Sequence, residues 1–295
     1  MANEIEKGCL YIVGTPIGTL SDMSERAKKV LSEVDFIAAE DTRVTGKLLM
    51  CLDIKSSMIR YFAHNKREKG EYILSRLKNG KSCALVTDAG MPAISDPGED
   101  LVRLCAENSV TVYCVPGPSA VVSALAISGL PTSRFTFEGF LSTNKRERRE
   151  RLESVKDFPH TLIFYEAPHK LCDTLSAMLE IFGDRKISVV KELTKLNENV
   201  FRTTLSGAVA HYVENPPKGE FVLVIEGASE KLCEHFWDGM SVSEHVDFYI
   251  DEGIDKMDAF KKVARDRGVS KSVIYKEYNK LCKNSQISID KKIIV

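Results

Sequence analysis

The 295-residue sequence has no paired cysteine motif, no clustered histidines and no long hydrophobic run. Its eight cysteines form no C-x-x-C pair, which argues against a zinc or disulfide framework. The six histidines show no H-x-x-x-H spacing, so we expect no metal site. The longest apolar stretch, AVVSALAISGL, is too short to cross a bilayer, and MANEIEKGCL carries acids where a signal peptide needs basic residues. These absences predict a cytoplasmic protein with no membrane partner.

Two glycine-rich phosphate-binding motifs are also missing. The loop VGTPIGTLSD follows a strand-like run but contains neither G-x-G-x-x-G nor G-x-x-x-x-G-K-[ST]. A net charge of −1 argues against a protein that coats nucleic acid indiscriminately. The sequence therefore gives no sign of a nucleotide-phosphate loop or of a general nucleic-acid coat.

Short β-rich runs alternate with amphipathic stretches in the first part of the chain. LYIV, VDFIAA, CALVT and TVYCV follow this rhythm, which is typical of a parallel sheet covered on both faces. Prolines and glycines concentrate at 116–131 and mark a domain boundary. A second set of predicted strands follows: RFTFEGF, TLIFYE, ISVVKE, NVFRTTL and EFVLVIEG. The last three lie close together, which indicates antiparallel members. We predict an α/β fold with a parallel-sheet domain at 1–117 and a mixed-sheet α+β domain at 118–230.

The pattern turns helical and basic toward the C-terminus. Nine basic residues face three acidic ones between 256 and 283. Ala264, Gly268 and Ile274 have the spacing of a helix-turn-helix, with a small residue at the contact, a glycine at the turn and an apolar anchor. The sequence predicts a basic helix-turn-helix-like module at 241–285.

Four loops rich in glycine and proline follow predicted strands: VGTPIGTLSD, TDAGMPAISDPG, PGPSA and YEAPHK. The carboxyl ends of strands form the ligand crevice of an open α/β sheet, so we expect these loops to meet at one pocket. They offer small side chains, backbone groups and the carboxylates of Asp88, Asp96 and Glu166, with few cations. This chemistry favours a cationic or zwitterionic, adenosine-like ligand over a phosphate.

Eight ordered motifs span nearly the whole chain: YIVGTPIGTLSDMSERA, FIAAEDTRVTGKLL, ALVTDAGMPAISDPG, VPGPSA, SGLPTSRFTFEGFL, TLIFYEAPHK, KELTKLNE and KGEFVLVIEG. Together they resemble those of the ribosomal RNA small-subunit methyltransferase I family, within the tetrapyrrole-methylase-like class III methyltransferases. Two motifs depart from the family: Thr19 stands where asparagine is usual, and YFAHNK replaces YHEHNE, with Phe62, Ala63 and Lys66 as the differing residues.

The resemblance implies a two-domain tetrapyrrole-methylase-like enzyme, normally a homodimer, that binds S-adenosylmethionine in the cleft between its domains. Its acceptor would be the ribose 2′-hydroxyl of a cytidine in the decoding region of small-subunit ribosomal RNA. The family's cofactor-binding motifs map onto Pro16, Ala89, Gly90, Met91, Ile94, Ser119, Ala120, Tyr165 and Leu193.

A ribose hydroxyl is a poor nucleophile at neutral pH, so a proton acceptor should assist the transfer. Asp88 and Glu166 stand at predicted strand ends and are the candidate catalytic residues. The stretch KRERRERLESVK has six basic and three acidic residues and is a candidate RNA contact. The candidate acceptor-binding residues are Glu40, Asp41, Arg43, His64, Asn65, Arg146 and Arg149.

Two other functions remain open at this point. Relatives with the same cofactor cleft methylate tetrapyrroles, so a small-molecule methylase is one alternative. A ligand-sensing DNA-binding regulator that uses the basic helices is the other. The fate of the methyl group separates the three functions. An RNA methyltransferase transfers it to subunit RNA, a small-molecule methylase transfers it to a porphyrinoid, and a regulator binds the cofactor without transfer.

Overall fold

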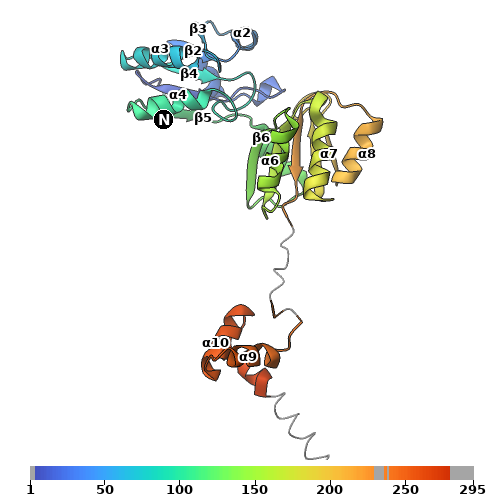
Figure 1. Ribbon diagram of the computed structural model, residues 1–295. Helices are drawn as coiled ribbons and strands as arrows, with labels where there is room; N and C mark the ends of the chain where they lie inside the picture. The colour runs from blue at the N-terminus through green and yellow to red at the C-terminus, as the bar shows by residue number, and fades with distance from the viewer. Residues whose placement is uncertain (1–3, 229–235, 238, 280–295) are drawn as a thin grey trace, which may run out of the picture. The chain divides into compact units, whose positions relative to one another are not determined.

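The computed structural model describes residues 4–228, 236–237 and 239–279 (Figure 1). The chain divides into two compact units, Met1–Ser229 and Glu230–Val295. Parts of the predicted regions, 1–3, 229–230 and 280–285, lie outside the described residues. Within the described part, every helix is too short or too polar to cross a membrane.

The first sheet of the N-terminal unit has five parallel strands in the order β3-β2-β4-β1-β5. Its strands are β1 (Leu10–Val13), β2 (Phe36–Ala39), β3 (Met58–Arg60), β4 (Cys83–Val86) and β5 (Val112–Val115). The intervening helices are η1 (Leu20–Asp22), α1 (Glu25–Glu33), α2 (Thr42–Cys51), α3 (Lys66–Lys78) and α4 (Gly98–Glu107). The predicted parallel sheet is confirmed.

Both faces of this sheet are buried because successive side chains of a strand point to opposite sides. On one face, side chains such as Val13 and Ala39 pack with α1 and α2. On the other, Leu10 and Phe36 pack with α3 and α4. This two-sided burial explains why the strands appear in the sequence as unbroken apolar runs.

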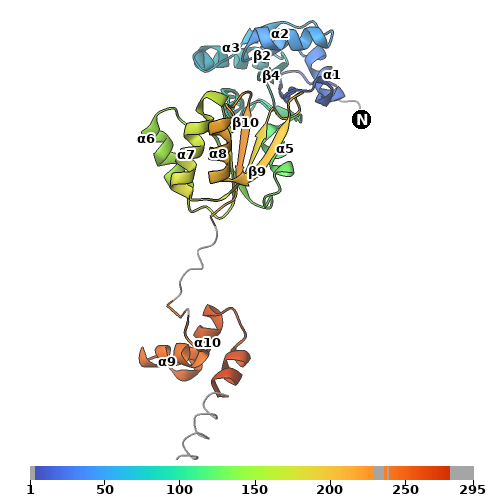
Figure 2. The ribbon, with the colours of Figure 1, turned by 90° about the vertical axis from the view of Figure 1, so that its right-hand side faces the viewer.

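The second sheet is mixed, with the order β6-β7-β10-β8-β9. Strand β6 (Phe135–Phe140) runs parallel to β7 (Thr161–Glu166), whereas β10 (Phe221–Ile225) pairs antiparallel with β7 and β8 (Lys186–Lys191), and β9 (Asn199–Thr204) with β8. The helices are α5 (Ala120–Ser128), α6 (Lys145–Val155), η2 (Pro168–Lys170), α7 (Leu171–Phe182) and α8 (Leu205–Glu214). Figure 2 shows α6, α7 and α8 on one face and α5 on the other. The expected mixed sheet is confirmed.

The C-terminal unit is helical, as expected. Helices α9 (Val242–Asp251) and α10 (Lys256–Asp266) and helical residues 271–279 share one apolar core. Ala264 and Ile274 are 6% and 1% exposed within that core, and Gly268 between them has a φ of +64°. The helix-turn-helix assignment of this region stays a prediction.

Candidate active site

A cavity of about 570 Å³ lies where the loops of the first sheet meet one face of the second. All four proline- and glycine-rich loops contribute to its walls. The lining residues are Ile17, Glu40, Thr87, Asp88, Ala89, Gly90, Met91, Ile94, Ser95, Asp96, Ser119, Ala120, Phe140, Tyr165, Glu166, Ala167, Pro168, Val190, Leu193, Glu220, Phe221 and Val222. This volume falls in the range of small-molecule and cofactor sites.

One wall of the cavity is an apolar row across the second sheet. Val222 on β10 is in register with Tyr165 on β7 and with Val190 on β8. The ring of Phe140 lies 5.3 Å from that of Tyr165. Such a surface suits the flat, partly apolar body of a nucleoside.

Backbone contacts hold the opposite loops in place. Thr15 donates its amide to the Gly90 carbonyl at 3.0 Å, and Gly90 donates its own to the Thr15 carbonyl at 3.2 Å. A Cβ on Gly117 would lie 2.8 Å from the Cα of Gly14, so the backbones touch at these two glycines. The loop after β1 is therefore tied to the loops after β4 and β5.

The two sheets are also joined across the cavity by a pair of threonines. Thr19 donates its hydroxyl to the Thr194 carbonyl at 2.6 Å, and its amide donates to Thr194 Oγ1 at 3.3 Å. Thr19 is one of the positions where the sequence departs from the family motif. Its hydroxyl links the first loop to the segment after β8.

Four non-glycine residues with positive φ lie beside the cavity. Ala93 and Ser95 have φ values of +67° and +64° in the loop after β4. Glu192 and Thr194, at +51° and +62°, flank Leu193. Such conformations cost free energy and persist where the surrounding structure holds them, which is common at ligand sites.

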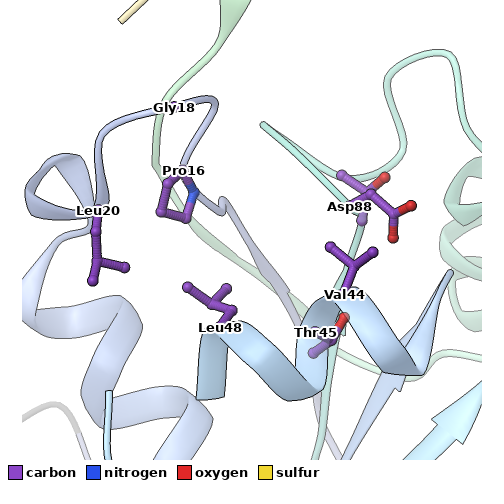
Figure 3. Close-up of a pocket in the computed structure, with 8 residues that line it drawn as sticks. Pro16, Gly18, Leu20, Val44, Thr45, Leu48 and Asp88 are labelled. Carbon is purple, nitrogen blue, oxygen red and sulfur yellow. The ribbon is translucent and has the colours of Figure 1, made fainter. Parts of the chain in front are cut away.

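Asp88 lies at the junction of this cavity and a smaller pocket of about 170 Å³ (Figure 3). In Figure 3, Leu48 on α2 points toward Pro16, while Asp88 stands on the far side of Val44. The smaller pocket is lined by Pro16, Gly18, Leu20, Val44, Thr45, Leu48, Thr87 and Asp88. Pro16 thus lines this pocket rather than the larger cavity.

The carboxylate of Asp88 has an increased affinity for a proton. Burial, followed by the nearby charge of Glu40, raises the pKa of Asp88, although the Asp41 amide donates to its Oδ1 at 3.2 Å and opposes the shift. Glu40 is held in turn by the Thr87 hydroxyl at 2.8 Å. A carboxylate with a raised pKa at a cavity wall is suited to accept a proton.

Glu166, the second candidate base, has its carboxylate occupied by protein groups. Its Oε2 accepts from the Thr174 hydroxyl at 2.6 Å and its Oε1 from the Ala167 amide at 2.8 Å. Lys170 Nζ lies 3.0 Å from Oε1. These contacts stabilise the turn that follows β7.

Asp41 and Arg43 form an ion pair at the start of α2, next to Asp88. Arg43 donates to Asp41 from Nε at 3.0 Å and from Nη2 at 2.5 Å, which holds the pKa of Asp41 below its usual range. The Arg43 side chain is nevertheless 83% exposed, so its outer edge can reach a ligand.

His64 and Asn65 line neither pocket, but they lie in the turn between β3 and α3. Asn65 accepts from the Phe62 amide at 2.9 Å and donates to the Arg60 carbonyl at 3.0 Å, so its side chain shapes that turn. His64 is exposed and its ring lies 5.9 Å from that of Phe62, over which Arg60 stacks at 4.4 Å. Tyr61 belongs to the core.

Arg146 and Arg149 lie on α6 and line no part of the cavity. Arg146 pairs with Glu150 at 2.8 Å and Arg149 with Glu180 at 2.6 Å. Within the ranges that the structure describes, no three histidine, cysteine or acidic residues are grouped as metal ligands would be.

Part of the cavity wall consists of strand residues that the sequence pattern does not single out. Phe140, Val190 and Val222 are apolar strand residues that look like core in the sequence. Val190 and Val222 alternate with residues of the opposite face, where α6, α7 and α8 pack, and they lie on the face that α5 covers in part and the cavity borders.

Residues 9–209 match the model of the tetrapyrrole (corrin/porphyrin) methylases. A ribosomal RNA small subunit methyltransferase I from Halalkalibacterium halodurans is 48% identical over 276 residues, which are 93% of this chain and 96% of the relative. The chain belongs to the ribosomal RNA small subunit methyltransferase I family. The Bacillus subtilis relative of the same name is 44% identical over 93% of this chain and 95% of its own length.

One member of the family is shorter. The relative of the same name from Thermotoga maritima is 47% identical over 220 residues, which are 99% of its length but 75% of this chain. This relative carries the same name although it lacks a counterpart to about a quarter of this chain.

Solved structures show the same fold at low identity. Uroporphyrin-III-C-methyltransferase from Thermus thermophilus superposes with a TM-score of 0.53 at 18% identity, over 75% of this chain and 95% of its own. A cobalt precorrin-4 methyltransferase gives 0.54 at 19% identity, over 74% and 94% of the chains. Family membership makes the protein a methyltransferase that uses S-adenosylmethionine.

Proposed function

We propose that the protein transfers a methyl group from S-adenosylmethionine to the ribose 2′-hydroxyl of a cytidine in small-subunit ribosomal RNA. The observation that carries this proposal is the position of Asp88, which lines both a cofactor-sized cavity and a smaller adjoining pocket. The substrate follows from the relatives, which are named for small-subunit ribosomal RNA. We place the reaction in the cytoplasm and assign the enzyme as a homodimer on the family resemblance.

The chemistry of the larger cavity suits this cofactor. Five carboxylates line it, and among the described residues of its walls there is no lysine, arginine or histidine. The carboxylates are those of Glu40, Asp88, Asp96, Glu166 and Glu220. A negative, partly apolar cavity favours a cationic ligand with an adenosine body. The predicted contacts Ala89, Gly90, Met91, Ile94, Ser119, Ala120, Tyr165 and Leu193 all belong to these walls.

When bound, S-adenosylmethionine supplies an electrophilic methyl group. The protein holds the acceptor oxygen in line and excludes water. Asp88 accepts the proton of the ribose hydroxyl, a contribution of about 10²–10⁴-fold in rate. Because the contacts of Glu166 are already made within the protein, we assign it a positioning role: it holds the turn that presents Tyr165.

The smaller pocket receives part of the acceptor nucleotide. It is mostly apolar and adjoins Asp88, as a pocket for the reacting nucleoside must. Two neighbours support Asp88: the charge of Glu40 raises its pKa, and the backbone amide of Asp41 donates a hydrogen bond to its carboxylate. Arg43 and the turn with His64 and Asn65 face the flanking RNA, where an exposed guanidinium can contact phosphate.

The two alternatives are not favoured. The corrin and porphyrin methylases share the fold at 18–19% identity, whereas the relatives at 39–48% identity carry the ribosomal RNA name. A regulator without turnover does not fit membership of a methyltransferase family.

A labelling assay tests the proposal. Small subunits that lack the modification are incubated with the protein and methyl-labelled S-adenosylmethionine, and the label is located by nuclease digestion. We expect label on the ribose of one cytidine. Label on a base, on a porphyrinoid precursor, or on nothing would contradict the proposal.

Removal of residues 241–295 is expected to raise KM for small subunits while the affinity for S-adenosylmethionine stays unchanged. The basic residues of this region add electrostatic attraction to RNA, and the cofactor cavity belongs wholly to the N-terminal unit. The shorter relative suggests that docking rather than chemistry depends on this region. Steady-state kinetics with subunits would give an unchanged KM if the region has no docking role.

A further inference from the structure

Arg148 occupies a core position on α6. The inner face of this helix carries Arg148, Leu152 and Val155, at helical spacings of four and three. Leu152 and Val155 are 0% and 2% exposed and belong to the core of the second sheet, and Arg148 is only 6% exposed. A guanidinium thus lies where the pattern calls for an apolar side chain.

Among the described residues, the guanidinium of Arg148 has no acceptor. Its Nε is enclosed and without a hydrogen-bond partner, and no residue in the described part of the chain forms an ion pair with Arg148. By contrast, Arg146, Arg149 and Arg151 on the same helix pair with Glu150, Glu180 and Glu138. Enclosing part of a cation without an anion is unfavourable, because the hydration lost at Nε is not replaced.

Arg148 lines a groove of about 330 Å³ between α6 and α7. The other lining residues are Lys145, Arg149, Asp173, Ser176, Ala177, Glu180 and Ile181. Of the two carboxylates, Glu180 is taken by Arg149, and Asp173 forms no ion pair with Arg148 among the described residues. The groove therefore has an excess of positive charge and unused guanidinium donors.

We propose that this groove binds a phosphate group of the RNA backbone, with Arg148 as its principal ligand. A phosphate would supply the acceptors that the guanidinium lacks, in the two-pronged geometry that arginine prefers. Lys145 and the Ser176 hydroxyl line the same groove and can contact the remaining oxygens. The identity of the ligand as RNA rests on the proposed function. The RNA contact of α6 is thereby assigned to Arg148 rather than to the predicted Arg146 and Arg149.

Inorganic phosphate tests the site without RNA. Thermal unfolding of the full chain is followed with and without phosphate, for the wild type, Arg148→Met and the control Arg103→Met, which removes an exposed cation on α4. We expect phosphate to raise the Tm of the wild type and the control but not that of Arg148→Met. Without phosphate, Arg148→Met should be at least as stable as the wild type, because methionine fills the space without a charge. If phosphate raises the Tm of Arg148→Met as much as that of the wild type, the proposal is overturned, whatever the stability of the variant.

Small subunits identify the source of the phosphate. The salt dependence of subunit binding should be weaker for Arg148→Met, with a log–log slope smaller by about 0.7–0.9, the value for one phosphate contact. The affinity for S-adenosylmethionine should not change. If subunits are methylated but the slope is the same in both proteins, the RNA site is refuted while the proposed function stands. If the wild type neither binds nor methylates subunits yet responds to phosphate through Arg148, the proposed function fails and the groove is a site for free phosphate.

Discussion

Replacing Asp88 with asparagine is expected to lower kcat by about 10²–10⁴-fold, the usual contribution of a positioned proton acceptor. The affinity for S-adenosylmethionine should change little, because asparagine keeps the size of the side chain and can accept the Asp41 amide hydrogen bond. Single-turnover rates and cofactor titration separate the two quantities. A variant with the wild-type rate would show that Asp88 is not the proton acceptor.

The pH profile gives a second test of Asp88. Its pKa lies above the ordinary value of 3.8, so the carboxylate takes up a proton at a higher pH than an exposed aspartate. Since the charged form is the active one, the rate should fall as the pH drops through this raised pKa, and the asparagine variant should lack that limb. Glu40→Gln removes the charge that contributes to the shift and should move the limb to lower pH. A limb that stays in place in Glu40→Gln would assign it to another group.

The strands were predictable where burial is two-sided. Strands β1, β2 and β4 are buried on both faces, and their apolar runs identify them as strands of a covered sheet. Strand β3, Met58–Arg60, was missed because it is a three-residue edge strand, partly exposed and flanked by polar residues. Tertiary pairing with β2, not local sequence, makes it a strand.

The site was predictable only in its loops. Glycine and proline mark the loops that follow β1, β4, β5 and β7, because tight backbone approach needs these residues. Val190 and Val222 lie on the sheet face against which α5 packs, and how much of that face borders the cavity is decided by packing between elements distant in sequence. Likewise, Arg148 differs from its neighbouring arginines in sharing the buried face of α6 with Leu152 and Val155. The basic run is visible in the sequence, but which of its arginines is buried depends on the face of α6 that packs on the sheet.

Replacing Gly117 with alanine is expected to destabilise the protein by about 1–3 kcal/mol, the usual effect of forcing extra volume into a packed region. The new Cβ would lie 2.8–2.9 Å from the Cα, carbonyl carbon and oxygen of Gly14, and backbone atoms cannot rotate away as a side chain can. The loops after β1 and β5 must then separate. Ser119 and Ala120 follow Gly117 after a single proline and line the cavity, so S-adenosylmethionine affinity should fall by at least about tenfold.

Gly46→Ala is the matched control for this steric argument. Gly46 lies inside α2, and an added Cβ would meet only Met58 Cε, at 3.6 Å. Alanine should therefore stabilise the protein by about 0.5–1 kcal/mol through helix propensity and leave cofactor binding unchanged. Chemical denaturation and cofactor titration of both variants give the comparison. Wild-type cofactor affinity in Gly117→Ala would mean that the contact between the two glycine backbones does not set the shape of the cavity.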